Sequence, residues 1–237
     1  MQRYFVDLKE KDIFILNNDD SHHVIDVMRM NVSDKVEIVY NSNLYIAQII
    51  SINTPVKCKI IEEISNAGNT IPKVIIAQSL VKEQKMDYIL QKSCELGVYE
   101  IIPLNTVRSI VKLDKKDDKK IIRWQKILKE ASEQTKRFDI PKIYSIIDLK
   151  ELINVNANYK FICSVKENTK TIKSVLSNVD ISDTILFVIG PEGGLDVSEE
   201  EYLINNGFIP ITFGKNVLRT ETASSFVLSA INYEFLR

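Results

Sequence analysis

Cysteine and histidine are scarce in this chain of 237 residues. The three cysteines, Cys58, Cys94 and Cys163, are widely scattered and form no Cys-x-x-Cys pair, so the sequence predicts neither a disulfide framework nor a structural zinc site. The two histidines, His22 and His23, are adjacent and would not share a helix face, which argues against a chelating pair. We therefore expect no metal site, and we expect reduced thiols in a cytoplasmic protein.

Long apolar runs are also missing. The run TILFVI (184–189) is far shorter than the roughly 20 residues that a membrane-spanning helix needs. The N-terminal sequence MQRYFVDLKEKD lacks the features of a signal peptide. A hydrophobic content of 45% and a charged content of 27% are ordinary for a globular protein, and the length suits one large or two modest domains. We expect no membrane partner.

Positive charge is concentrated in one stretch of the chain. The formal net charge of −1 argues by itself against RNA binding, but residues 108–142 hold twelve Lys and Arg and only six Asp and Glu. A basic stretch of this kind can contact phosphates even when the whole chain is near neutral. A solvated helix face is the preferred interpretation for most of these lysines. Arg137, four residues after Glu133, is the residue that we treat as functional.

The N-terminal part of the chain has the pattern of a small β domain. Residues 1–64 contain five short segments rich in β-branched residues, several of which alternate apolar and polar side chains. Regularly spaced short strands favour a small barrel. A short helix near Ser21 to Met30 is expected to interrupt the strands, with Val24, Val27 and Met28 on its inner face.

The segment SNAGNTIP (65–72) marks a domain boundary, because it is rich in Asn, Gly and Pro and has no apolar periodicity. Beyond it, apolar strands alternate with helices, which predicts a mainly parallel sheet with helices on both faces. The helix expected over 83–96 ends at Gly97, where a left-handed residue fits. Asp196 and Glu199 have the spacing of a capping box at the start of another helix.

The strongest functional signal lies in the segments ILFVIGPEGGLDVSEEE (185–201) and FGKNVLRTETASSF (213–226). In each, an apolar strand runs into a loop of glycine, acidic and small polar residues, and the loop runs into a helix. Such loops lie at the carboxyl edge of a sheet, where α/β proteins bind ligands, so two of them suggest one composite pocket. Neither has the G-x-G-x-x-G or P-loop spacing of nucleotide-binding folds. A tight turn would explain GPEGG alone, but Arg219 and Glu221 in the second loop favour a binding site.

Together, IGPEGGL (189–195) and VLRTETA (217–223) resemble the signature of the SPOUT methyltransferases. More narrowly, they resemble the bacterial small-subunit (16S) rRNA uridine-N3 methyltransferases, and this resemblance covers nearly the whole chain. HVIDVMRM (23–30) is similar to the H-x-x-x-V-L-R-M segment of that family, and KMDYILQKSCELGV (85–98) to its Lys-rich helix ending in E-L-G-V. EQTKRFDIP (133–141) is similar to its E-Q-x-x-R segment.

The resemblance implies an α/β SPOUT-type domain over residues 72–237, with a C-terminal trefoil knot whose loops hold S-adenosylmethionine. It also implies a small PUA-like β-barrel over residues 1–68 that holds RNA. Periodicity alone indicates no knot. Members of the family dimerise across the knotted region, so the resemblance implies a homodimer, with 16S rRNA in the small ribosomal subunit as its partner. Asp26 stands where the family usually has Arg.

By resemblance, residues of both loops contact S-adenosylmethionine, mostly through backbone atoms: Ile189, Gly190, Gly194, Phe213, Gly214, Val217, Leu218 and Ala223. Glycine matters in such loops because a Cβ would block their close approach to the ligand. The residues expected to face RNA are Arg3, Arg29, Arg108, Gln134 and Arg137. His23 matches the position of the family histidine, and a hydrogen-bonded structural histidine is an equal alternative.

Methylation at N3 of uridine requires the imide to lose its proton, so a positioned base or an anion-stabilising donor is needed. Glu221 and Glu192 are candidates for the base or for orienting groups. Arg219 is a candidate for holding the target phosphate or for stabilising negative charge on the uracil carbonyls. The structural alternative is an ion pair between Arg219 and Glu221 that pins the loop. A paired uridine must also be exposed first, because N3 lies on the Watson–Crick edge.

The sequence therefore predicts an S-adenosylmethionine-dependent methyltransferase that acts on N3 of a specific uridine in 16S rRNA, on the assembled small subunit. Two alternatives stay open. One is a SPOUT enzyme that methylates a ribose 2′-OH or another base. The other is a non-catalytic RNA-binding protein of ribosome assembly, against which the intact GPEGG and LRTETA motifs weigh.

Overall fold

The computed structural model describes residues 1–64, 68, 70–113 and 117–235, so part of the boundary segment expected at 65–72 lies outside the described residues. The chain separates into two compact units. The first unit consists of Met1–Gly68 with Lys129–Ile140, and the second of Asn69–Leu128 with Pro141–Arg237. Residues 129–140 thus group with the first unit, although they lie inside the range 72–237 that the sequence predicts for the second domain.

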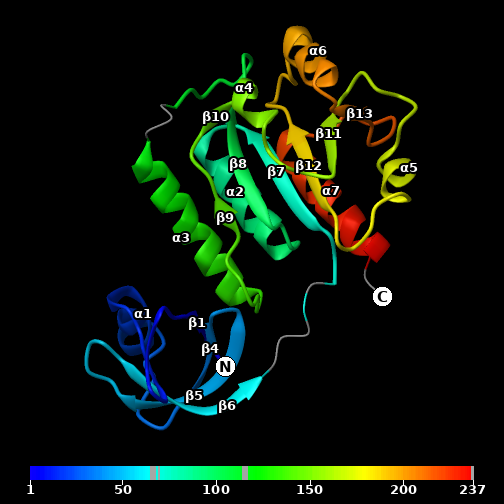
Figure 1. Ribbon diagram of the computed structural model, residues 1–237. Coiled ribbons are helices and arrows are strands. Elements are labelled where there is room, and N and C mark those ends of the chain that lie inside the picture. Colours follow the sequence, from blue (N-terminus) through cyan, green and yellow to red (C-terminus); the bar gives the residue numbers. More distant parts are fainter. Residues whose placement is uncertain (65–67, 69, 114–116, 236–237) are drawn as a thin grey trace. The chain divides into compact units, whose positions relative to one another are not determined.

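The first unit is built on a six-stranded sheet that is antiparallel except where β1 pairs with β4 (Figure 1). Its strands are β1 (Arg3–Phe5), β2 (Leu8–Glu10), β3 (Ile13–Ile15), β4 (Lys35–Tyr40), β5 (Asn43–Ser51) and β6 (Lys57–Ile64). Their order in the sheet is β1-β4-β5-β6-β3-β2, and β2 is the strand that the sequence pattern did not predict. Inward residues such as Val36, Ile38, Ala47 and Ile49 form its apolar core.

Between β3 and β4, the chain forms α1 (Asn18–His22) and a π-helical turn, η1 (His23–Val27), in place of the expected regular helix. Val24 is buried as predicted, but Val27 and Met28 are 58% and 45% exposed. The prediction for these two residues was wrong because it assumed an α-helical period. In the wider π turn, backbone hydrogen bonds reach five residues back, and the residues that follow are rotated away from the core.

Arg3 on β1 binds the segment 129–140 within the first unit. Its guanidinium donates to Glu37 Oε2 (2.9 Å) and to the carbonyls of Lys136 and Arg137. Burial opposes the ionisation of Glu37, but hydrogen bonds from Lys136 and Arg3 hold the pKa of that carboxyl below its ordinary value. Arg3 is only 4% exposed. The prediction that Arg3 faces RNA is therefore wrong, because its charge is used inside the unit.

Glu133, near the end of α3 (Asp118–Gln134), is a buried acid in the same unit. Its Oε1 atom accepts no hydrogen bond from the described residues, and the ammonium of Lys129, which also binds Asp20, lies 3.6 Å from it. Burial raises the pKa of Glu133 to about 7. The positive charge of Lys129 acts to lower this pKa, and the negative charge of Asp20 acts to raise it. The first unit therefore contains a carboxyl group that changes its charge near neutral pH.

We expect Glu133→Gln to stabilise the protein at pH 8 more than at pH 5. The folded-state pKa of about 7 lies above the ordinary glutamate pKa of roughly 4.3, so the unfolded chain binds fewer protons between these values. The stability contributed by protonated Glu133 is thus complete below about pH 4 and is lost as the pH rises to 7, by up to about 3 kcal/mol. Thermal unfolding at both pH values measures the effect, with the exposed Glu130→Gln as control. An equal gain at both pH values would contradict the expectation.

The second unit is built on a seven-stranded sheet, in which every pair formed by the described residues is parallel. Its order is β10-β8-β7-β12-β11-β13, and β9 also pairs with β8 (Figure 1). The strands are β7 (Lys73–Ser79), β8 (Glu100–Asn105), β9 (Lys142–Ile143), β10 (Ile147–Asp148), β11 (Tyr159–Cys163), β12 (Thr184–Ile189) and β13 (Ile209–Ile211). The predicted parallel sheet is confirmed.

Helices cover both faces of this sheet, as alternating strands and helices predict. Ile75 and Ala77 on β7 pack with Leu152 and Leu203 on one face, whereas Gln78 points to the opposite face, where α7 begins. The helices that follow α2 (Glu83–Glu95) and α3 are α4 (Leu149–Leu152), α5 (Ile172–Leu176), α6 (Val197–Asn205) and α7 (Thr220–Phe235). Helices α2 and α7 pack against each other. None of the helices in the described ranges is long and apolar enough to span a membrane.

Two local signals of the sequence are confirmed, and each fixes the end of one helix. Gly97 follows the end of α2 in the left-handed conformation, with φ of +86°. Asp196 and Glu199 form the predicted capping box at the start of α6. The chain between β12 and α6 is therefore a short loop with a fixed end.

Candidate functional site

The site lies where β11, β12 and β13 end. These strands are parallel, and β11 pairs with both of the others, so the loops that follow them meet at one edge of the sheet. They line one pocket, which is partly open to solvent. All eight predicted ligand contacts line it: Ile189, Gly190, Gly194, Phe213, Gly214, Val217, Leu218 and Ala223.

The first loop makes a tight turn that depends on glycine. The N–H of Gly194 donates to the carbonyl of Pro191 (2.9 Å), and Gly194 has φ of +69°. A Cβ on Gly190 would lie 2.9 Å from the backbone nitrogen of Leu195 and 3.1 Å from the carbonyl carbon of Gly194. The turn that explains GPEGG structurally is thus also the wall of the pocket, so the two interpretations of this motif are not exclusive.

Thr220 joins this loop to the start of α7. Its hydroxyl donates to the carbonyl of Gly190 (2.7 Å) and accepts from the side-chain amide of Gln78 (2.9 Å). Both side chains are buried, so these hydrogen bonds are shielded from water. The sequence analysis did not single out Thr220. Its position inside the LRTETA motif was the signal that could have found it.

A third wall of the pocket comes from the end of β11, at Cys163, Ser164 and Val165. The sequence analysis missed it, although the strand YKFICSV ends at the same sheet edge as the two motif strands. Burial raises the pKa of the Cys163 thiol, so it is not a reactive nucleophile. The ring of Phe213 packs against Phe226 on α7, with centroids 5.0 Å apart.

Arg108, which follows β8, holds the first loop from outside. Its guanidinium donates to the carbonyls of Gly193 and Leu195, both at 3.1 Å, and to the carboxylate of Asp196 at 3.0 Å. These three hydrogen bonds connect the loop to the neighbouring part of the sheet. The structure thus gives Arg108 a structural use, whereas its contact with RNA stays a prediction.

The candidate catalytic acids lie close to a lysine that the sequence analysis did not select. Lys85 on α2 has its Nζ atom 2.9 Å from Oε1 of Glu192 and 3.5 Å from Oε2 of Glu221. Glu192 also lines the pocket. The structural alternative of an ion pair between Arg219 and Glu221 was wrong, because among the described residues Arg219 makes no ion pair and is exposed. The signal for Lys85 was its place at the start of KMDYILQKSCELGV.

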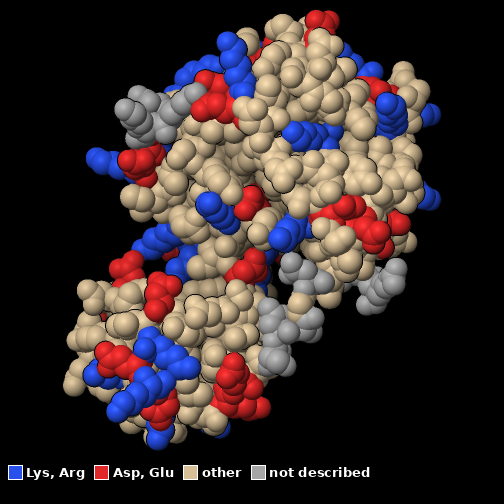
Figure 2. Space-filling view, in the orientation of Figure 1, with Lys and Arg blue, Asp and Glu red and all other residues tan. Residues whose placement is uncertain are grey.

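The remaining residues expected to face RNA lie in the first unit. Arg29 and Gln134 are exposed, whereas Arg137 is bound to Asp139 (2.9 Å) with its side chain 14% exposed. On the face shown in Figure 2, Lys and Arg side chains are interspersed with Asp and Glu, so charge alone does not mark a footprint there. The ring of His23 contacts Tyr4, whose hydroxyl lies 3.0 Å from Nδ1, as the structural alternative for this histidine predicts.

In the described part of the chain, no group of three or more His, Cys, Asp or Glu side chains is placed to hold an ion. Asp26, the visible departure from the family pattern, lies 2.6 Å from Nδ1 of His22. This residue is therefore an exposed surface partner of His22.

Comparison with known proteins identifies the family to which this chain belongs. The family model of an RNA methyltransferase domain matches residues 69–232, and that of an RNA methyltransferase PUA domain matches residues 16–63. The ribosomal RNA small subunit methyltransferase E of Bacillus subtilis is 36% identical, over 99% of this chain and 97% of its own length. The chain thus has the two domains of an RNA methyltransferase. It belongs to the ribosomal RNA small subunit methyltransferase E family.

Solved structures agree with this assignment. A methyltransferase from Legionella pneumophila in complex with S-adenosylmethionine has a TM-score of 0.90 and 28% identity, and covers 99% of this chain and 98% of its own. A ribosomal RNA small subunit methyltransferase E from Neisseria gonorrhoeae, also bound to S-adenosylmethionine, has a TM-score of 0.87 and 27% identity with the same coverage. The arrangement of both units' elements is therefore shared with these proteins.

We expect Arg108→Ala to loosen the first loop without unfolding the second unit. The variant loses three hydrogen bonds from a charged donor, so amide hydrogen exchange over residues 190–195 should accelerate on the order of tenfold or more. Exchange followed by mass spectrometry measures this. Arg123→Ala is the matched control, because Arg123 is equally exposed and binds Asp87 away from the loop. Similar rates of amide hydrogen exchange over residues 190–195 in both variants would show that Arg108 does not hold the loop.

Proposed function

We propose that this protein is an S-adenosylmethionine-dependent methyltransferase that methylates N3 of a specific uridine in small-subunit (16S) ribosomal RNA. We further propose that it acts in the cytoplasm, on the assembled small subunit. The observation that carries the proposal is the single pocket formed by the IGPEGGL and VLRTETA loops in a member of this family. The name of the relatives supports the substrate, and the ligand of the solved structures supports the cofactor.

The charge of the pocket and its backbone lining suit S-adenosylmethionine. The cofactor combines a neutral adenosine and a zwitterionic tail with a positive sulfur, and when bound it supplies the methyl group on that sulfur. Among the residues that line the pocket, Glu192 is the only acid and Lys215 the only base. The missing side chain of Gly190 lets the loop close on itself, so backbone groups line the wall. A nearly neutral pocket with one carboxylate suits a ligand of this kind.

The acids beside the pocket suit the proton transfer that N3 methylation needs. Glu221 Oε2 is buried and accepts no hydrogen bond from the described residues, which supports Glu221 as the acceptor of the N3 proton. Glu192 lines the pocket and orients the reacting groups. Arg219 is exposed and has no acidic partner among the described residues, so its guanidinium is available for the target phosphate or for negative charge on the uracil carbonyls.

The path of the chain supports the trefoil knot that the resemblance implies. Strand β13 lies at the edge of the sheet beyond β11, yet α7 begins beside β7 and the loop after β12, where Thr220 binds Gln78 and Gly190. The connection over residues 212–219 must therefore return across the carboxyl ends of β11 and β12. A knot requires in addition that the chain leading into α7 pass through one of the loops that it crosses.

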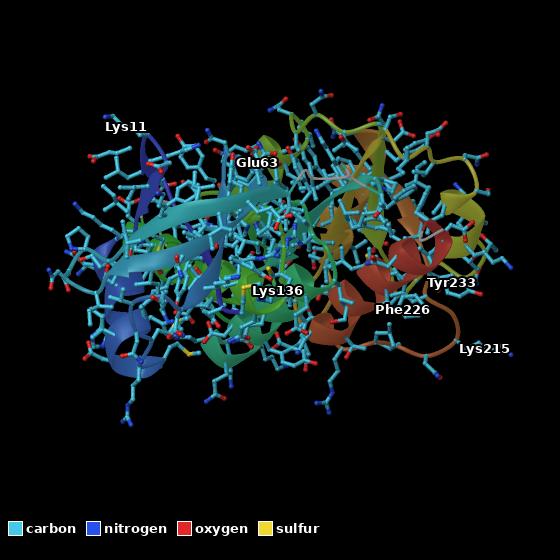
Figure 3. The ribbon with its side chains drawn as sticks, turned by 90° about the horizontal axis from the view of Figure 1, so that it is seen from below. Lys11, Glu63, Lys136, Lys215, Phe226 and Tyr233 are labelled. Carbon is cyan, nitrogen blue, oxygen red and sulfur yellow. The ribbon has the colours of Figure 1, made fainter. Side chains whose placement is uncertain are left out.

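Exposed apolar side chains on α7 support the proposed homodimer. Tyr233 is 88% exposed and Phe226 is 38% exposed, and Figure 3 shows both on this helix, with Lys215 on the loop that precedes it. Val217 on the same loop is 75% exposed. Large apolar side chains gathered on one element mark association surfaces. A second copy seated here would cover a rim of the pocket in each subunit.

We expect Gly190→Ala to abolish the binding of S-adenosylmethionine while the protein stays folded. The added Cβ meets backbone atoms at 2.9 and 3.1 Å, so the loop must open. Calorimetric titration should show the affinity falling by roughly 100-fold or more, since backbone displacement costs several kcal/mol. Gly193→Ala is the matched control, because its Cβ meets only the side chain of Arg108 at 3.6 Å. Equal affinities of the two variants would argue against this pocket.

Methylation of small ribosomal subunits tests the proposed reaction. The purified protein is incubated with S-adenosylmethionine labelled in its methyl group and with small subunits that lack native modifications. The RNA is then digested and its nucleosides are separated and identified by mass. We expect the label in 3-methyluridine, and much less label when the same rRNA is offered free of protein.

Each other outcome changes a different part of the proposal. Label in a ribose-methylated nucleoside or another base would keep the cofactor and overturn the N3 assignment. Equal labelling of free rRNA would overturn the assembled subunit as substrate. Absence of label and of S-adenosylmethionine binding would favour the non-catalytic RNA-binding alternative.

A further inference from the structure

A single cation connects the two candidate catalytic acids. Glu192 belongs to the loop after β12 and Glu221 to the first turn of α7, whereas Lys85 comes from the first turn of α2. The side chains of all three are partly buried, at 33% exposed for Lys85, 29% for Glu192 and 18% for Glu221. Three elements that are far apart in the sequence therefore place one positive and two negative charges beside the pocket.

We infer that Lys85 is a positioning residue for methyl transfer: its ammonium holds Glu192 and Glu221 together. Oε2 of Glu221, which lies 3.5 Å from this ammonium and accepts no hydrogen bond from the described residues, is thereby presented to the imide N3–H of uridine. The inference rests on the proposed function and adds a residue to the same site. In the step that it serves, the N3–H bond breaks, the proton passes to the Glu221 carboxylate, and the nitrogen lone pair forms the bond to the transferred methyl group.

The two contacts of Lys85 differ in length and therefore in strength. The 2.9 Å distance to Glu192 is that of a charge-assisted hydrogen bond, whereas 3.5 Å to Glu221 Oε2 is at the limit for any hydrogen bond. Glu192 is therefore the fixed partner. Glu221 is attracted by the same charge, but its Oε2 atom keeps its capacity to accept a proton donor. A buried acceptor of this kind carries a desolvation penalty that a bound imide N–H would remove.

The lysine is needed because two carboxylates would otherwise repel each other in a partly buried place. The hydrogen bond to Glu192 raises the pKa of Lys85. Burial acts to raise the pKa of Glu192, but the hydrogen bond from Lys85 acts against it, and the pKa of Glu192 is lowered. Lys82, just before α2, adds a second positive charge that acts on Glu192. Arg219 precedes α7 and makes no ion pair among the described residues, so Lys85 is the cation that touches both acids.

Substitution of Lys85 tests the inference through the rate of 3-methyluridine formation. In Lys85→Met we expect kcat at pH 7 to fall roughly 100-fold, the lower range for loss of acid–base catalysis, with KM for S-adenosylmethionine within about threefold of wild type. Lys85→Arg should recover most of the rate. Lys92→Met is the matched control, because Lys92 lies on the same helix, is 38% exposed and binds Glu95 at 2.8 Å. It should retain wild-type activity.

The pH profile separates a positioning role from a merely structural one. Without the ammonium, the paired carboxylates hold their protons more tightly, so the acid limb of kcat in Lys85→Met should move to higher pH by about one unit. In Lys85→Arg the limb should stay near that of wild type. A slower Lys85→Met enzyme with an unmoved acid limb, or one as fast as Lys92→Met, would overturn the inference.

A second measurement does not depend on activity. Carbon-13 labelling of the glutamate side chains allows each carboxylate to be titrated by NMR without RNA. The pKa of Glu192 should rise in Lys85→Met and stay unchanged in Lys92→Met, and an unchanged value in both variants would overturn the inference. If wild type forms no 3-methyluridine, the proposed function fails, and this titration still decides whether Lys85 holds the acids.

Discussion

The hydroxyl of Thr220 makes the pair of hydrogen bonds on which the pocket depends. It binds the carbonyl of Gly190 and the amide of Gln78, and so joins the loop after β12, the start of α7 and the middle of the sheet. Gln78 and Thr220 are separated by 142 residues, and both are buried. These two buried hydrogen bonds set the position of the loop relative to the helix. The other walls of the pocket follow from this alignment.

Cations outside the pocket fix the loop whose inner surface stays nearly neutral. Arg108 binds the loop through two carbonyls and Asp196, and Lys85 binds it through Glu192. Each belongs to an element other than the loop, so the loop is held by the sheet and by α2. This separation leaves the side chains of Arg108 and Lys85 outside the pocket that the loop lines.

The sequence predicted the local structure well where one physical signal acted alone. Alternating and continuous apolar runs predicted most strands, and Gly97 and the Asp196 capping box predicted helix ends. The two motif loops predicted residues that line the pocket. The sequence predicted the exposure of side chains incorrectly where the local backbone or distant partners differed from the expected ones. Val27 and Met28 are exposed because the chain forms a π turn there and not an α-helix. The guanidinium of Arg3 donates its hydrogen bonds to backbone carbonyls and to Glu37 within its own unit.

By themselves, the residues determined the two-part organisation, the parallel sheet and the loops that line the pocket, because these depend on periodicity, turn chemistry and a motif of neighbouring residues. Tertiary structure alone decided which distant side chains complete the site. Thr220 meets Gln78, Lys85 meets Glu192 and Glu221, and the end of β11 closes the pocket. No local pattern encodes such pairs, because they form only when strands far apart in the chain become neighbours in the sheet and bring their loops to one edge.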